Sequence, residues 1–520
     1  MNLSRVRRAT TEGRKNAWSA AFDVAERAYE RADYDHSLKL LDIASASAPA
    51  HTGEIELLRA RCARYAGDYE TSYAAAAAAS RDCDTTGLRL AAAVLQALAA
   101  KHLRKVTEAR RLFAALSAEI LAAPVREVGE ARYLLALAAF EEEDLERARE
   151  LLEPNLRANT HEAESLALAA TIEMSQSRYR EAGALFSKAQ RRMNASGRVD
   201  ARFDAVTLAS LAAIAAETVD LELGKRVRTS YEKMEWPASL TAERFAALEA
   251  LRTIALLEGD LASAFFAARE AVNLAPVPAL EAVAETQLAA VARMLGDLGS
   301  ERLQLRRAWD LLRAMRSEHF DPVVAYALAA FAAAAPGVFP IEARKAMVSY
   351  RSVVSKATAP LDPRLEALGA VGAARVAEAA GDRAGAVRQY RLALATWQRL
   401  GADLRTTIAA VDLRRFTGDD AYVKPVRAIV SRAPKAWFAA ELKRGRNPVS
   451  RLTPAERVVL ARLLRGESAK AIGEALERSP FTISNHTRKI FAAFELNSRS
   501  KVIARCVELG ITPEAIEREG

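Results

Sequence analysis

The sequence predicts an all-α protein, built as a long array of helix hairpins followed by a small four-helix domain. Three observations support this prediction. Alternating β-branched residues, which are typical of strands, are rare, whereas Ala, Leu, Glu and Arg at helical spacing fill nearly every window of the 520 residues. A turn signal recurs at a nearly regular period along most of the chain. From residue 441 onward, positive charge is in excess and the helix caps mark short helices.

The composition is typical of a folded globular protein. Apolar residues make up 51% of the chain and charged residues 27%, which excludes a disordered chain. A chain of this length is expected to form several domains or a repeat array. Its three cysteines lie far apart and form no CxxC pair, which argues against disulfides or a zinc site and fits the reducing cytoplasm. The net charge of +9 favours an acidic partner without naming one.

No targeting or membrane segment is expected. Residues 1–16 are basic but lack the apolar stretch of a secretory signal, so they are interpreted as a solvated lead-in. The most apolar run, residues 323–339, is interrupted by Pro336 and Gly337 and falls short of the roughly 20 residues that a membrane span needs. This run is therefore expected to be a buried helix, and no membrane partner is predicted.

A repeated turn marks the expected hairpins between residues 17 and 440. A small residue follows four positions after nine of the ten turns given below, where two helices can approach closely. The turn residues lie 34 to 43 positions apart, at Asp33, Asp68, Lys105, Asp144, Arg178, Asp220, Asp260, Asp297, Phe339 and Asp382. An eleventh copy is expected at Asp419. This period indicates a helix-hairpin solenoid of about 10 to 11 repeats.

One copy of the repeat is similar to a known motif. The stretch EGDLASAFFAAREAVNLAP, residues 258–276, closely resembles the second helix of a tetratricopeptide (TPR) repeat. Most spacings exceed the strict 34-residue period, so the resemblance implies a TPR-like superhelix and no particular subfamily. Arrays of this kind commonly hold a protein, a peptide or a small-molecule effector in a concave groove. A spacer or a dimerisation arm is the alternative interpretation.

The amino-acid composition and the charge of the chain change after the array. Residues 441–451 combine Gly, Pro and Ser with basic residues and are expected to form an exposed linker. Residues 441–520 carry 15 Lys or Arg against 10 Asp or Glu, so they hold five of the nine excess positive charges. Such a concentration of positive charge is expected of a nucleic-acid-binding module.

Helix caps predict four short helices after the linker. They are expected to begin at Thr453, Ser468, Ser479 and Ser498. The first carries a Thr-x-x-Glu capping box with Pro at its first helical position. The second is about two turns long, and the third runs to about Phe494. A short helix, a tight link and a longer cationic helix together indicate a helix-turn-helix.

The third helix has two distinct faces. One face is apolar, is expected to pack inward and consists of Ile483, Ile490, Phe491 and Phe494. The other face presents Ser484, Asn485 and Arg488, with Thr482 and Lys489 at its flanks. Amide, hydroxyl and cationic groups without a carboxylate suit a helix that lies in the major groove of DNA. A merely solvated face would account for the two cations alone.

The whole segment is similar to a known domain. Residues 452–511 closely resemble the LuxR or GerE type of helix-turn-helix domain, at many positions with undisturbed spacing. The matching residues include Leu452, Thr453, Pro454, Glu456, Gly466, Thr482, Ile483, Asn485, His486, Ile490, Asn497, Ser498 and Arg499. The resemblance implies a DNA-binding domain at residues 452–513, followed by a tail at residues 514–520.

The resemblance also implies roles for individual residues. The bases would be contacted by Ser484, Asn485 and Arg488, although Ser484 replaces the lysine that is common at its position. The DNA phosphates would be contacted by Lys470, Ser479, Thr482 and Lys489. The last helix often forms a dimer contact in that family, and here the contact would come from Val502, Cys506 and Leu509. On its own, Cys506 is most simply interpreted as a small core residue.

Sequence signatures of catalysis are absent. The chain contains no GxxxxGK[ST], GxSxG or HExxH motif and no cluster of Cys and His, so no enzyme, cofactor or metal is expected.

From the array and the helix-turn-helix together, we predict a DNA-binding transcriptional regulator that binds double-stranded DNA, with a homodimer as an expected form and the array as its sensor. The alternative is a protein-interaction scaffold or anti-regulator whose closing helices bind protein. A mobility shift with duplex DNA separates the two.

Overall fold

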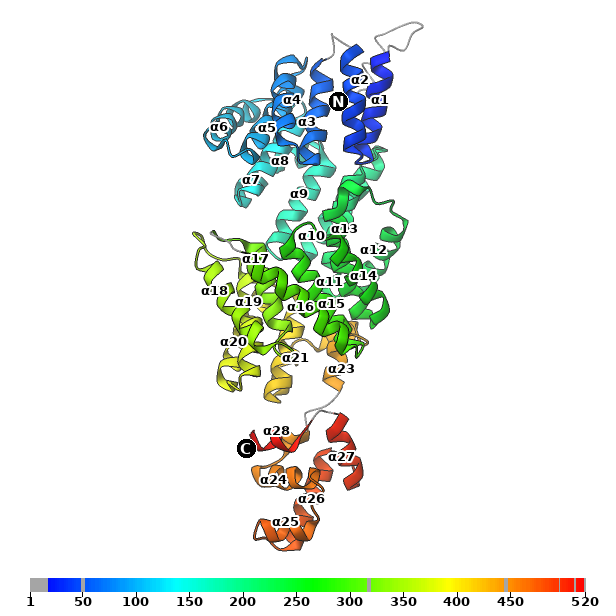
Figure 1. The fold of residues 1–520 in the computed structure, drawn as a ribbon. Helices are drawn as coiled ribbons and strands as arrows, with labels where there is room; N and C mark the ends of the chain where they lie inside the picture. The colour runs from blue at the N-terminus through cyan, green and yellow to red at the C-terminus, as the bar shows by residue number, and fades with distance from the viewer. Residues whose placement is uncertain are drawn as a thin grey trace.

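The computed structural model describes residues 17–47, 52–315, 319–443, 448–494, 496–508 and 511–518, and every regular element in these ranges is a helix (Figure 1). The prediction of an all-α chain is confirmed. The basic segment at residues 1–16 lies outside the described residues. No described helix is both long enough and apolar enough to cross a bilayer.

The first twenty helices form ten consecutive hairpins. They are α1 (Ala17–Glu30), α2 (Tyr34–Ser47), α3 (Thr52–Ala66), α4 (Tyr69–Asp82), α5 (Thr86–His102), α6 (Val106–Ala122), α7 (Gly129–Glu141), α8 (Leu145–Ala158), α9 (Glu162–Ser175), α10 (Tyr179–Ser196), α11 (Ala201–Thr218), α12 (Leu221–Lys233), α13 (Thr241–Glu258), α14 (Leu261–Leu274), α15 (Pro278–Met294), α16 (Leu298–Ala314), α17 (Pro322–Ala334), α18 (Pro340–Val354), α19 (Pro363–Ala379) and α20 (Arg383–Arg399). A 3₁₀ turn, η2 (Ala238–Leu240), precedes α13. Figure 1 shows the hairpins following one another along the chain.

The repeated turn residue has one local function. Each of the ten predicted positions directly precedes the second helix of a hairpin. Where the residue is Asp, its carboxylate accepts a hydrogen bond from a backbone N–H of the first turn, as Asp144 does from Arg147 at 3.0 Å. Such an N-cap is worth about 1 kcal/mol. The preceding glycine often adopts a positive φ, as Gly67 does at 81°, which a side chain would disfavour.

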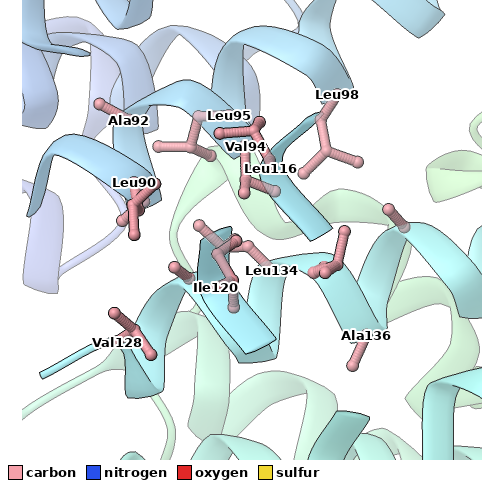
Figure 2. Packing of buried hydrophobic residues seen from close by; sticks show 14 of the residues in the cluster. Leu90, Ala92, Val94, Leu95, Leu98, Leu116, Ile120, Val128, Leu134 and Ala136 are labelled. Atoms are coloured by element: carbon pink, nitrogen blue, oxygen red, sulfur yellow. The ribbon is translucent and has the colours of Figure 1, made fainter. Parts of the chain in front are cut away.

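Alanine-rich helix faces allow the hairpins to pack closely. Figure 2 shows part of one core cluster, in which α5, α6 and α7 bury their apolar side chains against one another. Leu95 from α5, Ile120 from α6 and Leu134 from α7 are at most 5% exposed. Small residues between these larger ones let the helix backbones approach, as the spacing of the repeat predicts.

The eleventh expected hairpin does not form. After α21 (Asp403–Thr417), Asp419 caps only a 3₁₀ turn, η3 (Asp420–Tyr422). Two short helices follow, α22 (Arg427–Arg432) and α23 (Trp437–Lys443). Pro425 and Pro434 explain the difference, because a proline inside a helix removes a backbone donor and disfavours helical geometry at the residue before it.

The array closes on itself near its amino end. One core cluster combines side chains of the first hairpins with Ala205 from α11 and Leu240 from η2. The hydroxyl of Ser239 also donates a hydrogen bond to the carbonyl oxygen of Ala32, 207 positions away. The first hairpins therefore pack against the middle of the array as well as against their neighbours.

A second closure joins the middle of the array to its carboxy end. Arg405 on α21 donates a hydrogen bond through Nε to Glu217 Oε1 on α11, at 3.0 Å. Nearby, Phe438 on α23 shares a core cluster with Val219 and Leu257. The contact is close, because a Cβ added to Gly259 would lie 2.9 Å from the carbonyl oxygen of Lys435. The helix that leads to the carboxy-terminal domain is thereby held against α13.

The array buries the carboxyl group of Glu285 with an incomplete set of partners. Glu285 on α15 is 2% exposed, and its Oε1 lies 3.8 Å from an Nη atom of Arg307. Its Oε2 has no hydrogen-bond partner among the described residues. Burial raises the pKa of Glu285 to about 7, and Arg307 opposes this shift only in part.

We expect Glu285→Gln to stabilise the array at neutral pH. Since the pKa in the folded state is raised, the wild-type chain loses stability as the pH rises from the ordinary value near 4.5 towards 7. The variant should therefore match the wild type below pH 4 and exceed it by on the order of 2 kcal/mol at pH 8. Urea unfolding at both pH values measures this difference. Glu232→Gln, at an exposed position, is the matched control, and an equal gain at both pH values would contradict the assignment.

Candidate nucleic-acid interface

The carboxy-terminal helices have a hydrophobic core of their own. They are α24 (Pro454–Leu464), α25 (Ala469–Ala475), α26 (Pro480–Phe494), α27 (Arg499–Glu508) and α28 (Pro513–Arg518), preceded by the 3₁₀ turn η4 (Pro448–Arg451). The buried members of this core all lie between Val449 and Ile516. Figure 1 shows the five helices as a separate group.

Both edges of this domain differ from the expected ones. Val449, in the segment expected to be an exposed linker, is 1% exposed and belongs to the domain core, whereas residues 444–447 lie outside the described residues. At the other end, the segment expected to be a tail contains all of α28 except its first residue, Pro513. The amide N–H of Ala515 donates a hydrogen bond to Thr512 Oγ1, and Ile516 is 2% exposed. This extra helix packs against α24.

Local caps position the helix-turn-helix formed by α25 and α26. Ser468 accepts a hydrogen bond from the Ala471 N–H, and Ser479 accepts one from the Thr482 N–H, each at 3.2 Å. Sequence reasoning missed Gly473, whose added Cβ would lie 2.8 Å from the carbonyl oxygen of Arg478. A glycine inside a short helix was the available signal for this close approach.

Glu456 connects the first helix to the third. The predicted capping box is present, because Thr453 N–H donates to Glu456 Oε2 at 2.9 Å and Glu456 N–H donates to Thr453 Oγ1 at 3.3 Å. The same carboxylate lies 3.6 Å from Lys489 Nζ and 3.9 Å from His486 Nδ1 on α26. Burial favours the protonated acid, but the Thr453 hydrogen bonds and the neighbouring Lys489 and His486 side chains outweigh it and lower the pKa of Glu456. The resulting anion helps to fix the position of α26.

The two faces of α26 lie as the sequence predicts. Ile483 and Ile490 are fully buried and Phe494 is 7% exposed, so the apolar face packs into the core. On the opposite face Ser484 and Arg488 are exposed, and Asn485 is half-buried. The Arg488 guanidinium donates a hydrogen bond to Asn485 Oδ1 at 2.9 Å. The structure therefore brings the three residues with predicted base contacts onto one outward face.

The residues with predicted phosphate contacts surround this face. Ser479 is exposed at the N-cap of α26, and its hydroxyl lies 2.9 Å from that of the half-buried Thr482. Lys470 is exposed near the start of α25. Lys489 is exposed too, with 69% of its side chain accessible despite its proximity to Glu456. Each of the four side chains therefore retains some access to solvent.

Two of the three residues with a predicted dimer contact are buried. Val502 is 1% exposed and Cys506 is fully buried in the domain core, so neither is available to a second copy in this conformation. Leu509 lies outside the described residues. Burial raises the pKa of Cys506 to about 11, as expected of a small core residue. The large apolar side chain that α27 does expose is Val507, at 73%.

Sequence reasoning also missed an exposed aromatic residue at the start of α26. Phe481 is 73% exposed and follows directly after Pro480, the first residue of the helix. Its spacing of three, four and seven positions from Ser484, Asn485 and Arg488 was the available signal. A single apolar residue on a polar face is common, so this spacing alone does not indicate a function.

Comparison with known proteins identifies the class of this domain. Residues 450–506 match the GerE family, described as bacterial regulatory proteins, luxR family. The chain thus carries a LuxR-type helix-turn-helix domain after an array of helix hairpins. No curated protein matches the chain.

The solved structures that match the chain include two that cover most of its length. The APC/C hetero-tetramer Cut9-Hcn1 shares 14% identity at a TM-score of 0.26, with 83% of this chain and 90% of that chain covered. The structure of Naa15/Naa10 bound to HypK-THB shares 14% identity at a TM-score of 0.22, with 95% and 86% covered. Similarity at this level says nothing about partners or function.

Proposed function

We propose that this chain is a DNA-binding transcriptional regulator whose helical array controls the LuxR-type domain. The outward face of α26 carries the proposal, because it offers amide, hydroxyl and guanidinium groups without a carboxylate. Asn485 is suited to the N6 and N7 atoms of adenine, and Arg488 to the O6 and N7 atoms of guanine. Ser484 would contact either kind of base. A regulator of this kind acts on DNA in the cytoplasm.

The surrounding residues would set affinity and register. Ser479, Thr482, Lys470 and Lys489 are placed to contact phosphates, which position a protein on DNA without reading its sequence. A homodimer would present two such faces to two half-sites. Because Val502 and Cys506 are buried, the dimer contact on α27 would use the exposed Val507 in their place.

The array would receive the signal as a protein, a peptide or a small molecule. The second closure supports a route from the array to DNA, because Trp437 on α23 packs with Leu256 and Leu261. The chain continues from α23 towards the LuxR-type domain. An effector that favours or disfavours this closure would therefore change the position of α23, and with it the access of the domain to DNA.

Binding of the full chain to random-sequence duplexes tests the proposal. We expect fluorescence anisotropy to report binding that weakens steeply between 50 and 200 mM salt, on the order of tenfold or more, because cations that meet phosphates release counterions. Selection from random DNA should then return a defined sequence. If no duplex binds in a salt-sensitive manner, the protein-binding scaffold replaces the regulator.

A single lysine substitution separates phosphate contacts from base contacts. We expect Lys470→Ala to weaken binding to every duplex alike and to reduce the salt dependence by about one phosphate. Lys470 suits this test better than Lys489, which also lies near Glu456 inside the domain. Lys424→Ala, which removes an exposed lysine from the array, is the matched control. A loss confined to one sequence would instead assign Lys470 to base reading.

A further inference from the structure

Phe481 exposes an aromatic ring on a face that is otherwise polar. The residue is 73% exposed at the amino end of α26. Single exposed apolar residues are common and need no explanation by themselves. What distinguishes Phe481 is where its ring lies on the helix.

The ring lies at the centre of the proposed reading face. At about 100° per residue, Phe481 is about 20° from Arg488 around the helix axis and about 40° from Asn485. It is about 180° from Ile490, which is fully buried in the domain core. Phe481 thus points directly away from the core.

Its position along the helix adds a second constraint. Recognition helices contact base edges mainly through their amino-terminal residues, and Phe481 is the second residue of α26. The neighbouring hydroxyl groups of Ser479 and Thr482 lie 2.9 Å apart and bond to each other. At this end of the helix the ring is therefore the one large side chain on the outward face of the described residues.

The chemistry of the major groove limits what such a ring can recognise. A phenyl ring forms no ordinary hydrogen bond with the donors and acceptors of adenine, guanine and cytosine. The 5-methyl group of thymine is the apolar feature of that groove, and it is a known type of contact for phenylalanine. We propose that Phe481 contacts the 5-methyl group of a thymine beside the bases that Asn485 and Arg488 read. This inference rests on the proposed function and adds a base class to it.

Replacing thymidine by deoxyuridine tests the contact, because their bases, thymine and uracil, differ only in that methyl group. The full-length chain is titrated against its selected duplex, with each thymine replaced in turn. We expect one position per half-site to weaken wild-type binding about fourfold, the loss expected when one methyl group leaves an apolar contact. Phe481→Ala should bind thymine and deoxyuridine duplexes equally at that position. Phe481→Leu should retain about half of the discrimination on a logarithmic scale.

A matched control and two contrary outcomes complete the test. Val458→Ala removes an apolar residue on α24 that is 43% exposed, and it should leave the deoxyuridine profile unchanged. If the wild type binds its duplex but no deoxyuridine position weakens binding, the thymine contact is overturned. The thymine contact is also overturned if Phe481→Ala loses binding at the same deoxyuridine position, and by the same factor, as the wild type. If the wild type binds no duplex at all, the proposed function fails first.

Discussion

Ile490→Ala is expected to unfold the carboxy-terminal domain while leaving the array folded. Ile490 is fully buried in a core drawn only from residues between Val449 and Ile516. Removing most of such a side chain typically costs about 2–5 kcal/mol. A domain of this size rarely has more than about 3–5 kcal/mol of stability. The substitution should therefore remove most or all of it.

The measurement follows two unfolding transitions. We expect the wild-type chain to show a separate transition for the domain, and Ile490→Ala to lose that transition together with binding to duplex DNA. Phe331→Ala, at a fully buried position in α17, should affect the array transition alone. If instead Ile490→Ala shifts the unfolding of the whole chain as one step, the domain is not an independent unit.

The repeat could be predicted from sequence because its signal is local. An aspartate at an N-cap bonds within its own helical turn, so Asp68 or Asp260 marks a helix start without reference to the rest of the chain. The two closures left no such signal. Ser239 and Ala32 are 207 positions apart, and nothing in either local stretch indicates the other. Contacts of that kind depend on the summed curvature of many repeats.

Within the domain, helical phase decided which predictions succeeded. On α26 the buried Ile483 and Ile490 share one stripe and the exposed Ser484 and Arg488 share another, so two residues mark each face and the sequence resolves the two faces well. On α27 the exposed Val507 adjoins the buried Cys506, a difference of about 100°. A family resemblance names the helix that forms a contact, but the packing of this particular core decides which side chains it exposes.

Arg488→Ala and Asn485→Ala are expected to weaken binding to the selected duplex by about tenfold or more. A good contact between a side chain and a base is worth roughly 1–3 kcal/mol of discrimination. Each variant should lose its preference mainly at one base position, whereas its binding to random DNA should change far less. Anisotropy titrations against a panel of single-base changes measure this loss, and Arg427→Ala, at an exposed arginine of the array, is the matched control.

The double variant tests whether Arg488 and Asn485 act together. Because the Arg488 guanidinium donates to Asn485 Oδ1 at 2.9 Å, the two residues orient one another before DNA arrives. Neighbours that share a hydrogen bond show interaction energies of about 0.5–3 kcal/mol, so the two losses should not add. We expect the double variant to lose less than the sum of the single losses. Strict additivity, or an equal loss on every sequence, would show that the two side chains do not act together in reading bases.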